Sequence, residues 1–108
     1  MKIDIKATKV DLTPEIKDYV QRKMDMLEKY LGEIPVIECK VDLSLSVGGQ
    51  KTGEIYRTEI LMELPKEMLI VEKVESDLIK SIDKVKDHLA ESIIKYKEKM
   101  IDRHRQIV

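Results

Sequence analysis

The stretch SDLIKSIDKVKDHLAESIIKYKEKMIDRHR, residues 76–105, decides the fold of this chain. Apolar side chains recur in it at steps of three and four residues, at the positions Leu78, Ile82, Val85, Leu89, Ile93, Tyr96 and Met100. That spacing places them on one side of a helix with about 3.6 residues per turn. The stretch therefore predicts one long helix that packs this side against a core.

A second row of side chains in the same helix is basic. Its members recur at steps of four and seven residues: Lys80, Lys84, His88, Lys95 and Lys99. A basic row on one face is a candidate surface for a polyanion such as a nucleic acid. The same sector also receives Glu91, Glu98 and Asp102. Because exposed helices commonly mix both signs of charge, an ordinary solvated face is the alternative.

The composition indicates a soluble globular protein with one domain, residues 1–108. Charged residues make up 38% of the chain and apolar residues 43%, and the formal net charge is −1. Apolar runs are only a few residues long and the chain starts with no secretory signal, so we expect a cytoplasmic protein with no membrane partner. The single cysteine, Cys39, excludes an intrachain disulfide, and its place in an alternating strand predicts a small core residue.

The rest of the chain predicts one more helix and four strands. Residues 2–8, 37–47, 55–64 and 68–74 alternate apolar and polar side chains, which is the period of half-buried strands. Thr13 and Pro14 predict the start of a helix, and Gly32 predicts its end after residue 31. Turns are expected at residues 48–53 and 65–67.

These elements predict an α+β fold in the order β-α-β-β-β-α. A right-handed crossover joins the first two strands in parallel, and hairpins join the others, so the four-stranded sheet is mixed. Both helices can pack on one face of the sheet. The far face would carry charges able to pair across strands: Lys2, Asp4, Lys6, Glu38, Lys40, Asp42, Arg57, Glu59 and Glu63.

One flank of the first helix borders its apolar side. It carries Tyr19, Lys23, Met26 and Tyr30, which could line a groove between the two helices. The alternative is that these side chains merely seal the edge of the core.

The sequence offers no catalytic centre, metal site or cofactor site. His88 and His104 are sixteen residues apart on one helix, or about 24 Å, which is too far to share an ion. The glycines at 48, 49 and 53 lie between two strands with no helix behind them, so they do not form a phosphate-binding loop. We therefore expect a protein that is not an enzyme.

Several segments along the chain resemble one known family. They are residues 13–20 (TPEIKDYV), 23–24 (KM), 27–30 (LEKY), 54–60 (EIYRTEI), 69–72 (LIVE), 77–83 (DLIKSID) and 95–97 (KYK). These segments are similar, in the same order, to the ribosome hibernation promoting factor family, also called ribosome-associated inhibitor or sigma-54 modulation proteins. The resemblance covers residues 1–100 and agrees with the element order read from periodicity.

The resemblance implies a double-stranded-RNA-binding-like fold that docks its two helices in the decoding region of the small ribosomal subunit. Bound there, against 16S-type rRNA, the protein would block messenger and transfer RNA under stress and inhibit translation without catalysis. The contact residues carried over from the family are Lys23, Lys29, Lys84, Lys95, Lys97 and Lys99, with Lys80 and His88 as weaker candidates. Where the family often has a basic residue, this chain has Met26, His88, Glu91 and Ile94.

A second function stays open because of aliphatic side chains off the main apolar side of the last helix. Ile94, with Ile79, Ala90 and Ile101, could form a contact patch for another protein. Isolated surface aliphatics are also ordinary and need no partner. The alternative function is therefore a protein-interaction or dimerisation module, including a weak homodimer, that kept the fold and lost part of its RNA binding. Full-length short form and first domain of a longer form fit the sequence equally.

Overall fold

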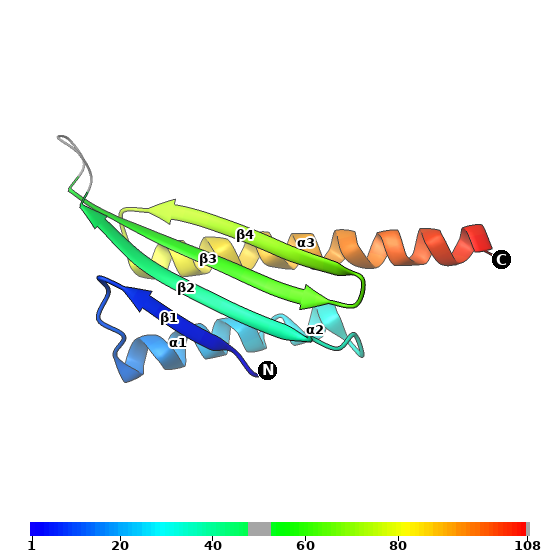
Figure 1. Ribbon diagram of the computed structural model, residues 1–108, viewed down its shortest axis with the longest axis horizontal. Coiled ribbons are helices and arrows are strands. Elements are labelled where there is room, and N and C mark those ends of the chain that lie inside the picture. The colour runs from blue at the N-terminus through cyan, green and yellow to red at the C-terminus, as the bar shows by residue number, and fades with distance from the viewer. Residues whose placement is uncertain (48–52, 108) are drawn as a thin grey trace.

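Four strands form one mixed sheet in the order β1-β2-β3-β4 (Figure 1). The computed structural model describes residues 1–47 and 53–107, and the side chains of residues 1–46 and 53–102. The strands are β1 (Asp4–Thr8), β2 (Glu38–Val47), β3 (Glu54–Leu64) and β4 (Glu67–Glu75). β1 pairs in parallel with β2, and the other two pairs are antiparallel. Of the predicted turn at residues 48–53, only Gly53 lies within the described residues.

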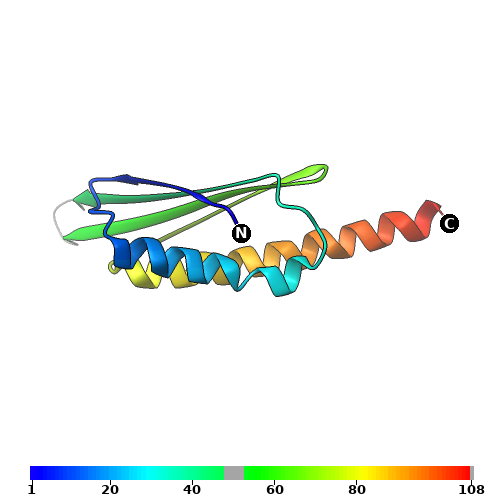
Figure 2. The same cartoon turned by 90° about the horizontal axis from the view of Figure 1, so that it is seen from below.

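The helices of the described chain cover one face of this sheet. They are α1 (Pro14–Asp25), α2 (Glu28–Leu31) and α3 (Leu78–Ile107). Figure 2 shows α1 and α3 side by side along that face, while the opposite face of the sheet is open. The C-terminal part of α3 extends past the end of the sheet. The predicted α+β class, mixed sheet and one-sided helix layer are confirmed.

The boundaries of the first helical segment follow from local chemistry. The Thr13 hydroxyl accepts a hydrogen bond from the backbone N–H of Ile16 at 3.3 Å, and Pro14 occupies the first helical position. At the other end, Gly32 adopts a φ of 60°, which only glycine adopts without steric cost, and α2 stops there. Both predicted boundaries are therefore confirmed.

The prediction of one continuous helix over residues 14–31 is wrong, because the segment is interrupted between α1 and α2. At this point the backbone N–H of Leu27 donates to the Met24 carbonyl, three residues back, at 2.9 Å. This tighter turn replaces the four-residue spacing of an α-helix. The chain resumes helical hydrogen bonding at Leu31, whose N–H donates to the Leu27 carbonyl at 3.1 Å.

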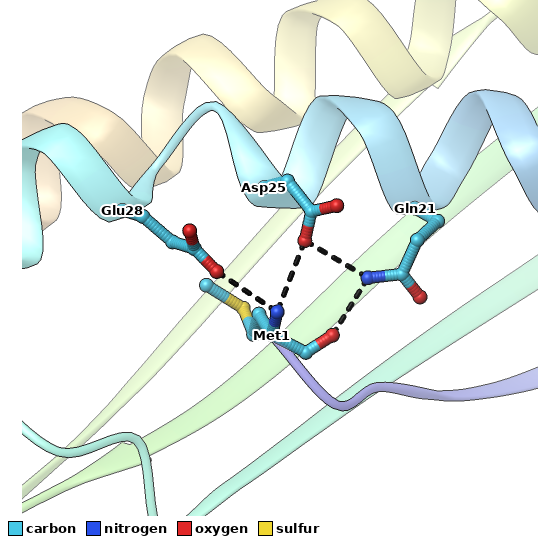
Figure 3. Close-up of polar contacts among 4 residues, drawn as sticks. All are labelled: Met1, Gln21, Asp25 and Glu28. Carbon is cyan, nitrogen blue, oxygen red and sulfur yellow. Dashed lines mark hydrogen bonds and ion pairs between the residues drawn. The ribbon is translucent and has the colours of Figure 1, made fainter.

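The amino group of Met1 contacts both carboxylates that flank this interruption. Its nitrogen lies 3.1 Å from Asp25 Oδ1 and 2.8 Å from Glu28 Oε1, and the Gln21 amide donates to the Met1 carbonyl at 2.6 Å (Figure 3). The Gln21 amide and then the Met1 amino group hold the pKa of Asp25 below its usual value. These contacts fix the segment preceding β1 against the helix layer.

The core lies between the sheet and the helices, as the apolar row of residues 78–100 predicts. α3 contributes Ile82, Val85, Leu89, Ile93 and Tyr96, all buried, while Leu78 and Met100 are partly buried at its ends. The sheet contributes Cys39, Val41, Leu43, Ile60, Met62, Leu64, Leu69 and Val71. The prediction that Cys39 is a small core residue is confirmed.

Two polar contacts fix α3 on the sheet. The hydroxyls of Thr58 on β3 and Ser81 on α3 are fully buried and hydrogen-bonded to each other at 2.7 Å. Near the other end, the Tyr96 hydroxyl donates to the Pro65 carbonyl in the β3–β4 turn at 2.8 Å. Because buried polar groups are costly unless they are paired, these contacts favour a single position of α3 along the sheet.

The open face of the sheet carries paired charges, as predicted, but also apolar side chains. Arg57 on β3 contacts Glu59 at 2.9 Å and Glu72 on β4 at 2.7 Å, which confirms pairing across strands. The sequence predicts a face that carries paired charges. That description fits β1 to β3 only, because β4 exposes Met68, Ile70 and Val74.

Candidate nucleic-acid interface

Four of the predicted contact residues follow the side of α3 that lies next to β4. They are Lys84, His88, Lys95 and Lys99, which recur at steps of four and seven residues and so share one side of the helix. The side is identified by two ion pairs. Lys84 contacts Glu75, and Lys99 Nζ lies 3.2 Å from Glu67 Oε1, with both carboxylates on β4. Lys84 holds the pKa of Glu75 below its usual value by hydrogen bonding.

His88 lies in a shallow surface hollow within this row. The hollow is lined by Lys73, Lys84, Asp87, His88 and Glu91. His88 is half-buried, and its Nδ1 atom has no hydrogen-bond partner among the described residues. Two acidic and two basic residues thus line the hollow together with His88, so this part of the row is mixed in charge.

A different side of α3 faces α1 and contains Asp83, which two α1 residues contact. The Tyr19 hydroxyl donates a hydrogen bond to Asp83, and Lys23 Nζ lies 3.4 Å from Asp83 Oδ1. Lys23 also lies 5.3 Å from the centre of the Tyr19 ring. Burial and then the contact with Asp83 raise the pKa of Tyr19 to about 12. Tyr19 and Lys23 therefore border the junction between the helices, as the sequence suggested.

The remaining predicted residues are Lys29, Lys80 and Lys97. Lys29 belongs to α2, and its Nζ lies 5.1 Å from the centre of the Tyr30 ring. Lys80 is exposed in the first turn of α3, four residues before Lys84 and on the same side of the helix. Lys97 follows Asp83 by fourteen residues, or about four helical turns, and so lies on the same side of α3 as Asp83. The eight predicted residues are therefore distributed over α1, α2 and more than one side of α3.

The predicted lysines differ in whether a carboxylate already binds them. Lys23, Lys84 and Lys99 are ion-paired within the chain. For Lys29, Lys80, Lys95 and Lys97, no carboxylate among the described residues lies within the 4.0 Å ion-pair distance. An incoming phosphate would meet these four lysines without displacing an internal partner. They make up the unpaired set of the helix layer.

Sequence reasoning missed the three carboxylates that bind the predicted lysines. Glu67 and Glu75 are the first and last residues of β4, and Asp83 lies one turn into α3. The sequence did contain a clue to the contacts of Glu67 and Glu75. A helix that runs back along β4 must place some of its lysines next to the two ends of that strand. Arg22 was also not among the predicted contact residues, although its guanidinium lies 5.9 Å from the centre of the Tyr19 ring.

At some positions the family resemblance led us to expect a basic residue, but this chain has a different one. These residues give the helix layer apolar and acidic character. Met26 and Ile94 have 44% and 41% of their surface exposed, and Glu91 is also exposed. Of the residues suggested to form a contact patch with Ile94, Ile79 and Ile101 are exposed. Its fourth member, Ala90, is buried at 7% exposure.

The thiol of Cys39 is poorly suited to nucleophilic chemistry, because burial raises its pKa to about 11. Among the residues that the structure describes, no group of three or more His, Cys, Asp or Glu side chains could hold a metal ion. The described helices also include none that is long and apolar enough to cross a membrane.

Three curated relatives share much of this chain's length. A ribosome hibernation promotion factor from Picosynechococcus sp. is 31% identical over 92% of this chain and 50% of its own length. A ribosome hibernation promoting factor from Azotobacter vinelandii is 26% identical over 97% of this chain and 91% of its own. A ribosome hibernation promotion factor from Lactococcus lactis is 28% identical over all of this chain and 56% of its own. The chain thus spans about half the length of two of these relatives.

Two solved structures share the fold. The Protein Y N-terminal domain from Thermus thermophilus has a TM-score of 0.67 and 26% identity, covering 87% of this chain and 94% of that domain. A ribosomal subunit interface protein from Coxiella burnetii has a TM-score of 0.75, covering 91% of this chain and 99% of that protein. At 18% identity, the second likeness concerns the fold alone.

A family model described as Sigma 54 modulation protein / S30EA ribosomal protein matches residues 3–101, nearly the whole chain. The match confirms the resemblance seen in the sequence. Members of this family are ribosome hibernation factors and not enzymes, which confirms the prediction of a non-catalytic protein. From the match over residues 3–101 we conclude that this chain belongs to the Sigma 54 modulation protein / S30EA ribosomal protein family.

Proposed function

We propose that residues 1–108 act as a single ribosome-binding domain that inhibits translation during stress. In this proposal the helix layer docks on the rRNA of the decoding region of the small ribosomal subunit, in the cytoplasm, and obstructs the sites of messenger and transfer RNA. The observation that carries the proposal is the family match over residues 3–101, together with relatives named as ribosome hibernation factors.

The surface chemistry of the helix layer supports this function. Structured RNA is recognised mainly through its phosphates and its shape, which requires cations on a rigid surface and few exposed aromatic rings. Lys80 and Lys95 are exposed on α3, about 22 Å apart along the helix axis. The buried Thr58–Ser81 pair and the Tyr96–Pro65 contact hold that helix on the sheet.

The proposed mechanism is obstruction at a stoichiometry of one protein per subunit. A helix layer fixed on a four-stranded sheet can fill an RNA cleft without rearranging, so little conformational entropy opposes binding. The unpaired set, Lys29, Lys80, Lys95 and Lys97, would contact phosphates directly. Lys23, Lys84 and Lys99 would contribute only after exchanging an internal carboxylate for a phosphate, which reduces their contribution to affinity.

Co-sedimentation with purified small and large ribosomal subunits tests the proposal. We expect binding to the small subunit and inhibition of cell-free translation at equimolar protein. Because each phosphate contact releases counterions, the logarithm of affinity should fall against the logarithm of salt concentration with a slope on the order of −3 to −5. Folded protein that fails to pellet with either subunit at low salt would overturn the proposal.

The second candidate function is a protein-interaction module with reduced RNA binding. The exposed Met26, Ile79, Ile94 and Ile101 side chains in the helix layer favour it, as do the internal partners of three predicted lysines. Apolar contacts respond little to salt, whereas phosphate contacts respond strongly. Ribosome association with a flat salt response would therefore favour this candidate.

A further inference from the structure

The strand β4 contains three glutamates and one lysine. Each glutamate is ion-paired with a cation of β3 or α3: Arg57 with Glu72, Lys99 with Glu67 and Lys84 with Glu75. The lysine, Lys73, has no carboxylate within 4.0 Å among the described residues. In the described part of the chain, Lys73 is therefore the charged residue of β4 that lacks an ion-pair partner.

Lys73 projects towards α3 and not towards the open face of the sheet. Side chains alternate between the two faces of a strand, so Lys73 shares the face of the buried Leu69 and Val71. It is half-buried and lines the same shallow hollow as His88 and Lys84 of α3. This lysine therefore borders the helix layer, although it belongs to the sheet and was not among the predicted contact residues.

Three lysines lie around the carboxylate of Glu75, where β4 ends and α3 begins. Hydrogen bonding to Lys84, followed by the charges of Lys80 and Lys73, holds the pKa of Glu75 below its usual value. Lys80 and Lys84 are four residues apart on α3 and so are neighbours on the helix surface. We call Lys73, Lys80 and Lys84 the lysine cluster. Three lysines against one carboxylate leave an excess of two positive charges.

Further carboxylates near the lysine cluster differ in whether they have a partner within the chain. Asp87 Oδ1 lies 2.8 Å from Lys86 Nζ. Asp77 Oδ1 accepts a hydrogen bond from the backbone N–H of Lys80 at 3.3 Å, at the start of α3. Glu91 lines the hollow and has no cation within 4.0 Å among the described residues. It offsets one of the two excess charges, so the lysine cluster keeps a net positive charge for an anion.

We propose that the lysine cluster binds a phosphate group of RNA, with Lys73 as a contact residue contributed by the sheet. The inference rests on the proposed binding of RNA by the helix layer, and it extends that surface from α3 onto β4. A phosphate held by Lys73 and Lys80 would meet two ammonium groups without separating the Lys84–Glu75 ion pair. Lysine binds phosphate as a compact point charge, so this contact contributes affinity without sequence preference.

Affinity for the small ribosomal subunit, measured by co-sedimentation over a range of salt concentrations, tests the proposal. Lys73→Met keeps an unbranched apolar stem and removes the charge, so affinity should fall by about three- to tenfold at low salt. The log–log slope against salt should also become shallower by about 0.7–0.9, because one phosphate contact is lost. Lys73→Arg retains the charge and should remain within about twofold of the wild type.

Lys6→Met is the matched control. Lys6 also lacks a carboxylate within 4.0 Å among the described residues, but it is exposed on β1, at the opposite edge of the sheet. Its removal makes the same change of net charge and should leave both affinity and slope as in the wild type. Circular dichroism checks folding, and Lys73→Gln replaces Lys73→Met if the latter does not fold. Equal affinities of the Lys73 and Lys6 variants would overturn the proposal and leave the proposed function intact.

A wild type that does not bind the small subunit would instead overturn the proposed function. Duplex RNA of about 20 base pairs is then the probe for the lysine cluster. The proposal is supported if the duplex binds the wild type and Lys6→Met at least about threefold more tightly than Lys73→Met. It is overturned if the duplex binds all three proteins equally or binds none of them.

Discussion

The outer face of the helix layer and the open face of the sheet both carry many charges, and on each face the cations differ in how many internal partners they have. On the sheet, Arg57 is held between Glu59 and Glu72 and Lys40 contacts Glu38, whereas Lys6 has no carboxylate within 4.0 Å among the described residues. On α3, Lys80 and Lys95 have no carboxylate within 4.0 Å among the described residues. A phosphate can therefore bind the helix layer without first separating an internal ion pair, whereas Arg57 would have to leave two carboxylates.

The same difference exists within the helix layer. Lys23 and Lys84 are bound by Asp83 and Glu75, although both belong to the predicted contact residues. The number of lysines on a surface is therefore a poor measure of its capacity for a polyanion. A better measure is the number of lysines that lack an internal carboxylate.

The largest expected effect is a difference in unfolding free energy between a truncation on the core side of α3 and one on its outer side. Leu89→Ala should lower the free energy of unfolding by about 2–5 kcal/mol, because Leu89 is fully buried and its truncation leaves a cavity. Ile94→Ala is the matched control, since it shortens an aliphatic side chain that is 41% exposed on the same helix, and it should cost less than about 1 kcal/mol. Urea denaturation measures both. Equal losses would mean that α3 does not pack as described.

A smaller effect is expected when the bound lysines are released. Glu75→Gln combined with Asp83→Asn frees Lys84 and Lys23, so affinity for the small subunit should rise by about three- to tenfold. Asp4→Asn combined with Glu63→Gln makes the same change of net charge on the open face of the sheet. If this control raises affinity as much, the gain comes from overall charge and not from the released lysines.

The smallest expected effect concerns the junction between α1 and α3 at high pH. Burial and Asp83 raise the pKa of Tyr19 to about 12, so the neutral phenol is favoured in the folded state. The resulting stabilisation is complete below the unfolded-state pKa of about 10 and is lost as the pH rises through about 12. Spectrophotometric titration should show a tyrosine that titrates near pH 12 and that Tyr19→Phe removes. In Asp83→Asn that tyrosine should titrate earlier, and an unchanged curve would contradict the contact.

The sequence was sufficient for features that depend on neighbouring residues. Thr13 and Pro14 start α1, and Gly32 ends α2, because caps act within one helical turn. The apolar row of α3 predicted its buried side, since the helical period fixes which residues share a face. The family was also recognisable, because its short segments occur in order along the whole chain.

Features that depend on distant contacts were not predictable in the same way. The interruption between α1 and α2 coincides with the place where Met1 contacts Asp25 and Glu28, more than twenty residues away in sequence. The ion pairs of Lys84 and Lys99 depend on how α3 is positioned along β4. The register of elements relative to one another is set by packing, so the partners of individual lysines became known only from the structure.

Reversing two charges on each of the two compared faces tests the central claim most directly. The helix variant is Lys80→Glu with Lys95→Glu, and the sheet variant is Lys6→Glu with Lys40→Glu, so both change the net charge equally. Affinity for the small ribosomal subunit should fall at least about tenfold in the helix variant and less than about threefold in the sheet variant. Equal affinities of the two variants, both folded, would contradict the assignment of the binding surface to the helix layer.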